Sequence, residues 1–266
     1  VSHCVYRQAL VYRIALARDV SAFQVNLHEV YRLTPDRPIA HHDQDTYPRI
    51  FASLSASAQS SAISRAKDSL QTRLNGEYDG HLPYMRTSAF GPSIAARLLP
   101  EDESFKVLVA VHSMIDAPHV FGTCLYPDFL EWLKALARIS RETDYSWFIK
   151  THPEPDKITD ATVADFVRDN PQFRLLPANS SHTQLAHEGL NLALTVYGTI
   201  ASEYPLLGVP VLNACPGNPH RSYSFSMTPV SRVEYERAIL TASDRMQNPI
   251  GIADSVREYH YMHRLH

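Results

Sequence analysis

Two segments of the chain combine residue types that suit the binding of phosphate. The first is Lys150-Thr151-His152-Pro153. A lysine and a histidine together can hold the phosphate of a leaving group and stabilise the charge that develops on it, while the proline fixes the local backbone. We therefore predict that His152 and Lys150 are catalytic and that Pro153 borders the binding site. In the competing interpretation, His152 only caps the helix that follows.

The second segment runs from Gly198 to Glu203. Gly198 lets the backbone approach a ligand closely, and Thr199 stands near a helix N-terminus, where free N–H groups attract phosphate. Glu203, one turn later, is suited to accept hydrogen bonds from ribose hydroxyls. A capping box does not explain this carboxylate, because the box position, three residues after Thr199, holds Ser202. We predict nucleotide contacts from Gly198, Thr199, Ser202 and Glu203.

Three further serines lie in segments that are also suited to bind parts of a nucleotide. Ser113 follows an apolar run and offers a small hydroxyl to a phosphate. Ser180 and Ser181 lie in a polar stretch whose backbone groups are suited to hold a nucleotide base. An ordinary polar turn explains Ser113 about as well, and an N-cap cluster for the next helix explains the other two equally well. We place all three among the binding residues.

The histidines of the chain do not form a metal-binding pattern. The pair His41-His42 and the pair His260 and His263 have no acidic or thiolate partner at metal-ligand spacing. We expect His260 and His263 to be solvated on the surface of a helix. The sequence also lacks the Gly-Lys-Ser/Thr phosphate loop and the serine nucleophile elbow. We therefore predict a site without metal.

The residues singled out above follow apolar runs that alternate with helical patterns. We expect strands at 106–112, 147–150, 173–176, 192–197 and 209–213. We expect helices at 126–141, 159–168, 183–189, 200–207, 232–240 and 253–264, another beginning within 53–66, and a short one before Leu99. This alternation predicts an α/β fold with a Rossmann-like parallel sheet covered by helices on both faces. Ligands bind such sheets beyond the carboxyl ends of the strands, where the four segments should meet.

The composition of the chain excludes several classes of protein. The chain has 266 residues, 44% of them hydrophobic, 20% of them charged, and a net charge of −3. This charge excludes the basic footprint of a nucleic-acid binder, and the apolar content excludes a disordered chain. No apolar run reaches the roughly 20 residues that span a bilayer, and no signal peptide stands at the start. The cysteines Cys4, Cys124 and Cys215 are an odd, widely spaced set, which favours a reducing cytoplasm over a disulfide framework.

Two of these motifs, taken together, resemble a known family. The combination of Lys150-Thr151-His152-Pro153 with the segment Gly198–Val211 is similar to bacterial capsule and surface-carbohydrate biosynthesis proteins. These are glycosyltransferases of the GT-B type and include the Kdo transferases of capsule assembly. The His-Pro motif also resembles that of bacterial sialyltransferases that use CMP-sugars. Residues 257–263 resemble the closing helix of the surface-carbohydrate proteins.

The resemblance implies two Rossmann-like domains with a nucleotide-activated sugar between them, and no cofactor beyond that substrate. It implies that Lys150, His152 and Thr199 face the donor phosphate and that Glu203 faces the ribose. We divide the chain into a partial N-terminal acceptor-side α/β domain (1–103), a nucleotide-sugar-binding domain (104–252) and a closing helix (253–266). The N-terminal part is short for this family, and we expect residues before Val1 to be missing.

The predicted function is transfer of a sugar from a CMP- or UDP-sugar to a surface-polysaccharide acceptor, either a glycan or a lipid-linked one. We expect a cytoplasmic enzyme that associates peripherally with the inner face of the membrane and binds no nucleic acid. Three alternatives stay open: a CDP-alcohol phosphotransferase, a nucleotide-sugar epimerase on the same scaffold, and a non-catalytic protein of the GT-B fold. Fold alone does not decide among them.

Overall fold

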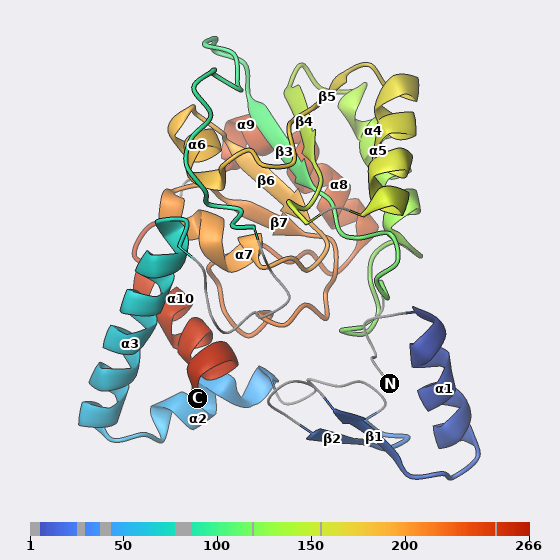
Figure 1. Ribbon diagram of the computed structural model, residues 1–266, viewed down its shortest axis with the longest axis vertical. Helices are drawn as coiled ribbons and strands as arrows, with labels where there is room; N and C mark the ends of the chain where they lie inside the picture. Colours follow the sequence, from blue (N-terminus) through green and yellow to red (C-terminus); the bar gives the residue numbers. More distant parts are fainter. Residues whose placement is uncertain are drawn as a thin grey trace.

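The computed structural model describes residues 6–25, 30–37, 44–77, 87–118, 120–154, 156–247 and 249–266. Its centre is a five-stranded parallel sheet flanked by helices, a Rossmann-like α/β fold (Figure 1). The strands are β3 (Lys106–Ala110), β4 (Ser146–Lys150), β5 (Phe173–Leu175), β6 (Leu192–Thr195) and β7 (Val211–Asn213). They are hydrogen bonded in the order β5-β4-β3-β6-β7. The predicted fold class is confirmed.

The helices lie on both faces of this sheet because its central strands are apolar on both sides. One core joins β3, β4 and β6 to α4 (Phe129–Ser140), α5 (Lys157–Asp169), α8 (Arg232–Leu240) and α9 (Ala242–Arg245). The core of the opposite face joins the same sheet to α6 (His182–His187), α7 (Ile200–Glu203) and the 3-10 helix η2 (Tyr204–Leu207). Gly208 ends η2 with a φ of 77°, a conformation that glycine adopts without strain.

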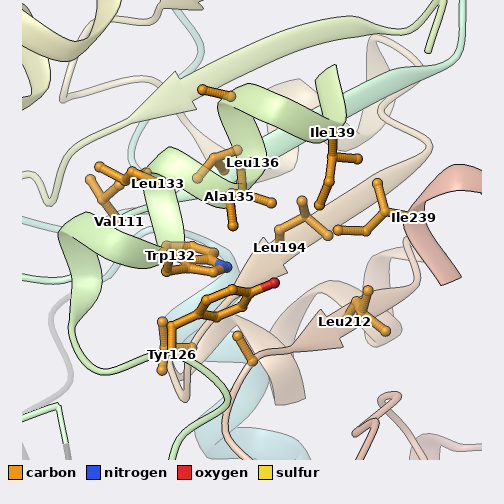
Figure 2. Packing of buried hydrophobic residues seen from close by; sticks show 14 of the residues in the cluster. Val111, Tyr126, Trp132, Leu133, Ala135, Leu136, Ile139, Leu194, Leu212 and Ile239 are labelled. Atoms are coloured by element: carbon orange, nitrogen blue, oxygen red, sulfur yellow. The ribbon is translucent and has the colours of Figure 1, made fainter. Parts of the chain in front are cut away.

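Helix α4 shows how the sequence builds the first core. Asp128 caps the helix by accepting a hydrogen bond from the Glu131 N–H at 2.8 Å. The apolar side of the helix packs towards Leu194 and Leu212 of the sheet (Figure 2). Trp132 is fully buried there, and its indole N–H donates to the Tyr235 hydroxyl at 2.9 Å. Burying one such large side chain stabilises the fold by about 1.5–3 kcal/mol.

Residues 94–99 pack against the second face, although the sequence division places them before the boundary at 103. Glu188 accepts hydrogen bonds from the backbone N–H groups of Leu98 and Leu99, each at 2.8 Å. Gln184 exchanges two bonds with the backbone of Ile94. The short helix predicted before Leu99 is wrong, because these backbone groups bond to side chains of α6 and its end instead of to each other.

The chain before residue 78 adds two smaller parts. Helix α1 (Tyr6–Ala17) packs on the antiparallel pair β1 (Ala22–Val25) and β2 (Val30–Leu33). Then follow η1 (Gln44–Thr46), α2 (Tyr47–Ala52) and α3 (Ala56–Leu74). Among the described residues up to 103, the only sheet is this two-stranded one. The division into domains stays a prediction.

Helix α3 lies beside the C-terminal helix α10 (Ala253–His260), which continues as the π-helical turn η3 (Tyr261–Leu265) (Figure 1). The prediction that His260 is solvated is wrong. His260 is buried between these helices, and its Nε2 shares a hydrogen bond with the Ser69 hydroxyl at 2.9 Å. His263 stacks on Tyr259. Residues 41 and 42, and Cys4, lie outside the described residues. No helix in the described ranges is long and apolar enough to cross a membrane.

Candidate active site

The order of the strands fixes where a ligand site can lie. From β3 the chain moves outward to β4 and β5, and then returns to the other side of β3 for β6 and β7. The direction of winding thus reverses between β3 and β6, and ligands of such folds bind at the carboxyl ends of the strands at this point. The loops that follow β3, β4 and β6 are the ones that border it.

Hydrogen bonds join the loops after β3 and β6. The Gly198 N–H donates to the Thr195 hydroxyl oxygen at 3.1 Å, and that hydroxyl lies 3.0 Å from Nε2 of His112. The Tyr197 N–H also donates to this nitrogen, at 3.3 Å. A Cβ atom at Gly198 would stand 2.7 Å from the Thr195 hydroxyl, so the tight turn after β6 requires glycine.

His112 was not among the predicted site residues. Its ring stacks on Phe129 with centroids 5.0 Å apart. Burial, with a contribution from nearby His152, lowers the pKa of His112 to about 3. The imidazole is therefore neutral at pH 7. Because Nε2 accepts the Tyr197 N–H, the proton lies on Nδ1.

Lys150, at the end of β4, is 2% exposed. Its ammonium donates to the carbonyl of Thr151 at 3.3 Å, and among the described residues it forms no ion pair. Burial lowers the pKa of this group to about 8. An ammonium has three N–H donors, so a single long hydrogen bond leaves most of its capacity unused.

His152 stands beside Lys150 and is exposed at the edge of the sheet. Its Nδ1 accepts a hydrogen bond from the Glu154 N–H at 3.0 Å, which leaves the ring proton on Nε2. Neighbouring protein atoms that reduce the hydration of its ring, followed by the charge of Lys150, lower the pKa of His152. The imidazole is thus a neutral donor at pH 7. It does not cap helix α5, because Asp156 does so through the N–H groups of Ile158 and Thr159.

Glu203 is buried and already has protein partners. Its carboxylate accepts a hydrogen bond from Nε of Arg73 at 2.5 Å and lies 3.4 Å from the Thr199 hydroxyl. This ion pair joins α3 to α7 across the site. Arg73 and Lys150 both contribute to lowering the pKa of buried His182, after the larger effect of burial itself. Arg73 therefore belongs to the same group of charges, although no motif pointed to it.

Asp116 is a second residue that the motifs did not select. It lies in the loop after β3, where its N–H donates to the Ser113 carbonyl at 3.0 Å. The structure gives its half-buried carboxylate no hydrogen bond from a described residue. Burial, followed by the negative charge of Asp156, raises the pKa of Asp116 to about 6. Such a shifted carboxyl at a ligand edge is typical of an acid–base group.

The predicted residues divide into two layers. Those at the open edge, half-buried or exposed, are Ser113, His152, Pro153, Gly198 and Thr199. Those beneath it, buried, are Lys150, Ser180, Ser181, Ser202 and Glu203. All of these residues lie at or after the ends of parallel strands, so they lie towards the carboxyl edge of the sheet.

The serines differ in how their hydroxyls are used. Ser113 donates to Asp156, and Ser202 donates to the Thr199 carbonyl at 3.0 Å. The buried hydroxyls of Ser180 and Ser181 have no hydrogen-bond partner among the described residues. Ser181 stands at the N-cap position of α6 but makes no capping bond with its side chain, so capping does not account for it.

The helix after β6 differs from the prediction. The predicted helix 200–207 is split into the four-residue α7 and the 3-10 helix η2. The axial dipole at Thr199 is correspondingly weak, which removes one reason for placing a phosphate there.

Among the described residues, no group of three or more histidine, cysteine or acidic side chains is arranged to hold a metal ion.

No model of a known protein family matches the chain, and no curated protein matches it. Among solved structures, the beta Kdo 2,4 transferase KpsC of Thermosulfurimonas dismutans is similar, with a TM-score of 0.46 and 11% sequence identity. The similarity covers 75% of this chain and 63% of that one. This chain therefore spans less than two thirds of the length of that protein.

Proposed function

We propose that the protein is a glycosyltransferase that binds a nucleotide-activated sugar at the carboxyl edge of its sheet. The observation that carries this proposal is the buried ammonium of Lys150, which has one long hydrogen bond and no ion pair among the described residues. A buried charge without a counter-charge is costly, and natural proteins keep such groups where a ligand neutralises them. A phosphate oxygen supplies both the charge and the missing acceptors.

The neighbours of Lys150 favour a phosphate over a simple carboxylate. The Nε2–H of His152 is available as a neutral donor. Gly198, which has no side chain, would let a phosphate approach its backbone closely. Arg73 adds a second cation close by. We propose that these groups hold the phosphate next to the sugar and stabilise its charge as it leaves, without a divalent metal.

The remaining contacts follow the sequence prediction. We propose that Thr199 and Ser113 border the phosphate and that Ser180 and Ser181 lie towards the base. For Glu203 we keep the ribose as partner, since a carboxylate has more acceptor positions than Arg73 and Thr199 occupy. Asp116 is the carboxylate that we expect to act in the transfer step. The donor would be a CMP- or UDP-sugar and the acceptor a surface polysaccharide, used in the cytoplasm at the inner face of the membrane.

The first test is binding of CMP, CDP, UDP, GDP and ADP, measured by calorimetry both with and without EDTA. At a concentration 100 times Kd, a bound nucleotide stabilises the fold by about 2.7 kcal/mol. Replacing Lys150 by methionine keeps the stem and removes the charge. We expect binding to weaken about 10- to 100-fold, as loss of a charged hydrogen bond of about 1.5–3 kcal/mol implies.

The matched control is Lys67→Met, which removes an exposed charge from α3. This variant should bind like the wild type. If no nucleotide binds to the wild type, or if Lys150→Met binds with unchanged affinity, the proposed site is wrong. If EDTA abolishes binding to the wild type, the part of the proposal that excludes a metal is wrong.

A further inference from the structure

Two cysteines that are far apart in the sequence face each other in the fold. Cys124 lies in the loop between β3 and α4, and Cys215 follows β7 directly. Both carry free thiols and both are buried, at 9% and 0% exposure. They lie on two segments of the chain that are in contact with each other.

Backbone contacts on either side of the pair fix this arrangement. The N–H of Leu125, next to Cys124, donates to the carbonyl of Ala214, next to Cys215, at 3.0 Å. The Cys215 thiol in turn lies 3.9 Å from the carbonyl oxygen of Thr123. These two contacts bracket Cys124 from both sides and set it opposite Cys215.

The two thiols differ in acidity. The neighbouring Cys124 thiol is the main cause that lowers the pKa of Cys215, burial opposes it, and the Gly217 N–H and Arg221 lower it further. The S–H of Cys124 itself donates to the Pro118 carbonyl at 2.7 Å. The pKa of Cys124 is raised by its bond to Cys215 and by burial. The more acidic thiol of such a pair is the one that reacts as a thiolate.

We propose that Cys124 and Cys215 form a reversible disulfide when the protein meets hydrogen peroxide. The Cys215 thiolate attacks the peroxide oxygen, which gives a sulfenic acid on Cys215 and releases hydroxide. The thiol of Cys124 then attacks that sulfur, the S–S bond forms, and the sulfenic oxygen leaves as water. Over both steps the two thiols lose two electrons and the peroxide is reduced.

The proposed disulfide would lie in a loop that contacts the candidate active site. The loop that contains Cys124 also contacts the candidate active site, because its Ala117 carbonyl accepts the Tyr197 hydroxyl at 3.1 Å. A disulfide would hold this loop against the segment after β7 and would close a long stretch of chain. Cross-links of that kind stabilise a fold chiefly by restricting the unfolded state.

The test compares the full chain before and after treatment with hydrogen peroxide. The chain has three cysteines. We expect the count of free thiols to fall from three to one, the intact mass to drop by two hydrogens, and peptide mapping to join Cys124 to Cys215. The melting temperature should rise, and dithiothreitol should reverse all of these changes.

Cys124→Ser is the control, because Cys215 is fully buried and its own replacement risks the fold. In this variant the oxidised intramolecular product and the rise in melting temperature should both be absent. Three outcomes would overturn the proposal: a thiol count that stays at three, a cross-link that involves Cys4, or oxidation that ends in sulfinic acid.

Discussion

At the scale of single residues, the candidate site is defined by the protonation state of its groups. His112 and His152 are both neutral donors at pH 7, and each ring is oriented by a backbone N–H that bonds to one of its nitrogens. Lys150 keeps its charge at pH 7, since its pKa of about 8 lies above that value. The edge thus presents the buried cation of Lys150 and two oriented neutral imidazoles, a combination suited to an anion that gains charge during reaction.

Asp116→Asn should lower turnover and, at pH 7, raise the stability of the fold. The amide cannot act as a base or nucleophile, so turnover of a bound nucleotide-sugar should fall by at least about 100-fold, the usual size of such a loss, while nucleotide affinity stays the same. The folded state raises the pKa of Asp116 from 3.8 to about 6. The stability that this shifted carboxyl group contributes to the folded state is therefore complete below about pH 4. It is lost as the pH rises through 6.

The variant should consequently be more stable than the wild type at pH 7, by about 1–3 kcal/mol, and should lose this advantage near pH 4. Urea denaturation at several pH values measures the difference. Asp160→Asn, on the exposed side of α5, serves as control and should alter neither quantity. Unchanged turnover in Asp116→Asn would remove this residue from the site.

The sequence identified some of these residues and missed others for a physical reason. Lys150 and His152 were found because they adjoin each other at the end of a strand that its apolar residues reveal. Arg73 was missed, because only the packing of α3 brings it to Glu203. Asp116 was missed because its shifted pKa results from burial and from Asp156, and neither is visible in a linear pattern.

At the scale of elements, the strands of the parallel sheet and several helices were predictable, whereas β1 and β2 were not predicted. Strands β3, β4, β6 and β7 are buried and mostly apolar, although β5 exposes Arg174 and Leu175. The expected helix 232–240 coincides with α8. The helix after β6 was predicted as one element and is two. Pro205 stands at the start of η2 and has no N–H for an α-helical bond, so the chain tightens to a 3-10 turn there.

The ion pair between Arg73 and Glu203 is the element contact that we expect to matter most for stability. Both side chains are nearly buried, at 11% and 5% exposure. Arg73→Met leaves a buried carboxylate without its cation and should cost about 3–5 kcal/mol. The double replacement Arg73→Met and Glu203→Met removes both charges and should recover most of that loss.

A double-mutant cycle in urea denaturation measures the coupling between the two side chains. The control pair is Arg168 and Asp165, which are 67% and 65% exposed on α5. That surface pair should show a coupling below about 1 kcal/mol. A coupling of the same small size for Arg73 and Glu203 would mean that the buried pair is not what holds α3 to α7.

At the scale of the whole molecule, residues 47–74 and the C-terminal helix meet beside the candidate site. Helices α2 and α3 pack with α10 and η3 in one apolar cluster. That cluster is separate from the two cores of the sheet, and Arg73 reaches the site from its α3 side. The position of Arg73 therefore depends on the last residues of the chain, a dependence that no local pattern reveals.

Deleting residues 250–266 should test how far this dependence extends. The deletion uncovers the buried side of α3, including Leu70, and removes Val256, which is fully buried against it. We expect fast hydrogen exchange in residues 56–74, because α3 loses its apolar cover, while β3, β4 and β6 stay protected by their own cores. Nucleotide affinity should fall, since Arg73 is no longer held at the site.

The milder variant Val256→Ala should shift exchange in the same direction. It should cost about 1–3 kcal/mol, in the range of a large-to-small change in a packed core. Val233→Ala is the matched control, because Val233 is 77% exposed on α8 and its loss should change little. If the amides of β3, β4 and β6 lose protection together with those of α3, then the C-terminal helix supports the whole fold. The separation of the α3–α10 cluster from the sheet would then be wrong.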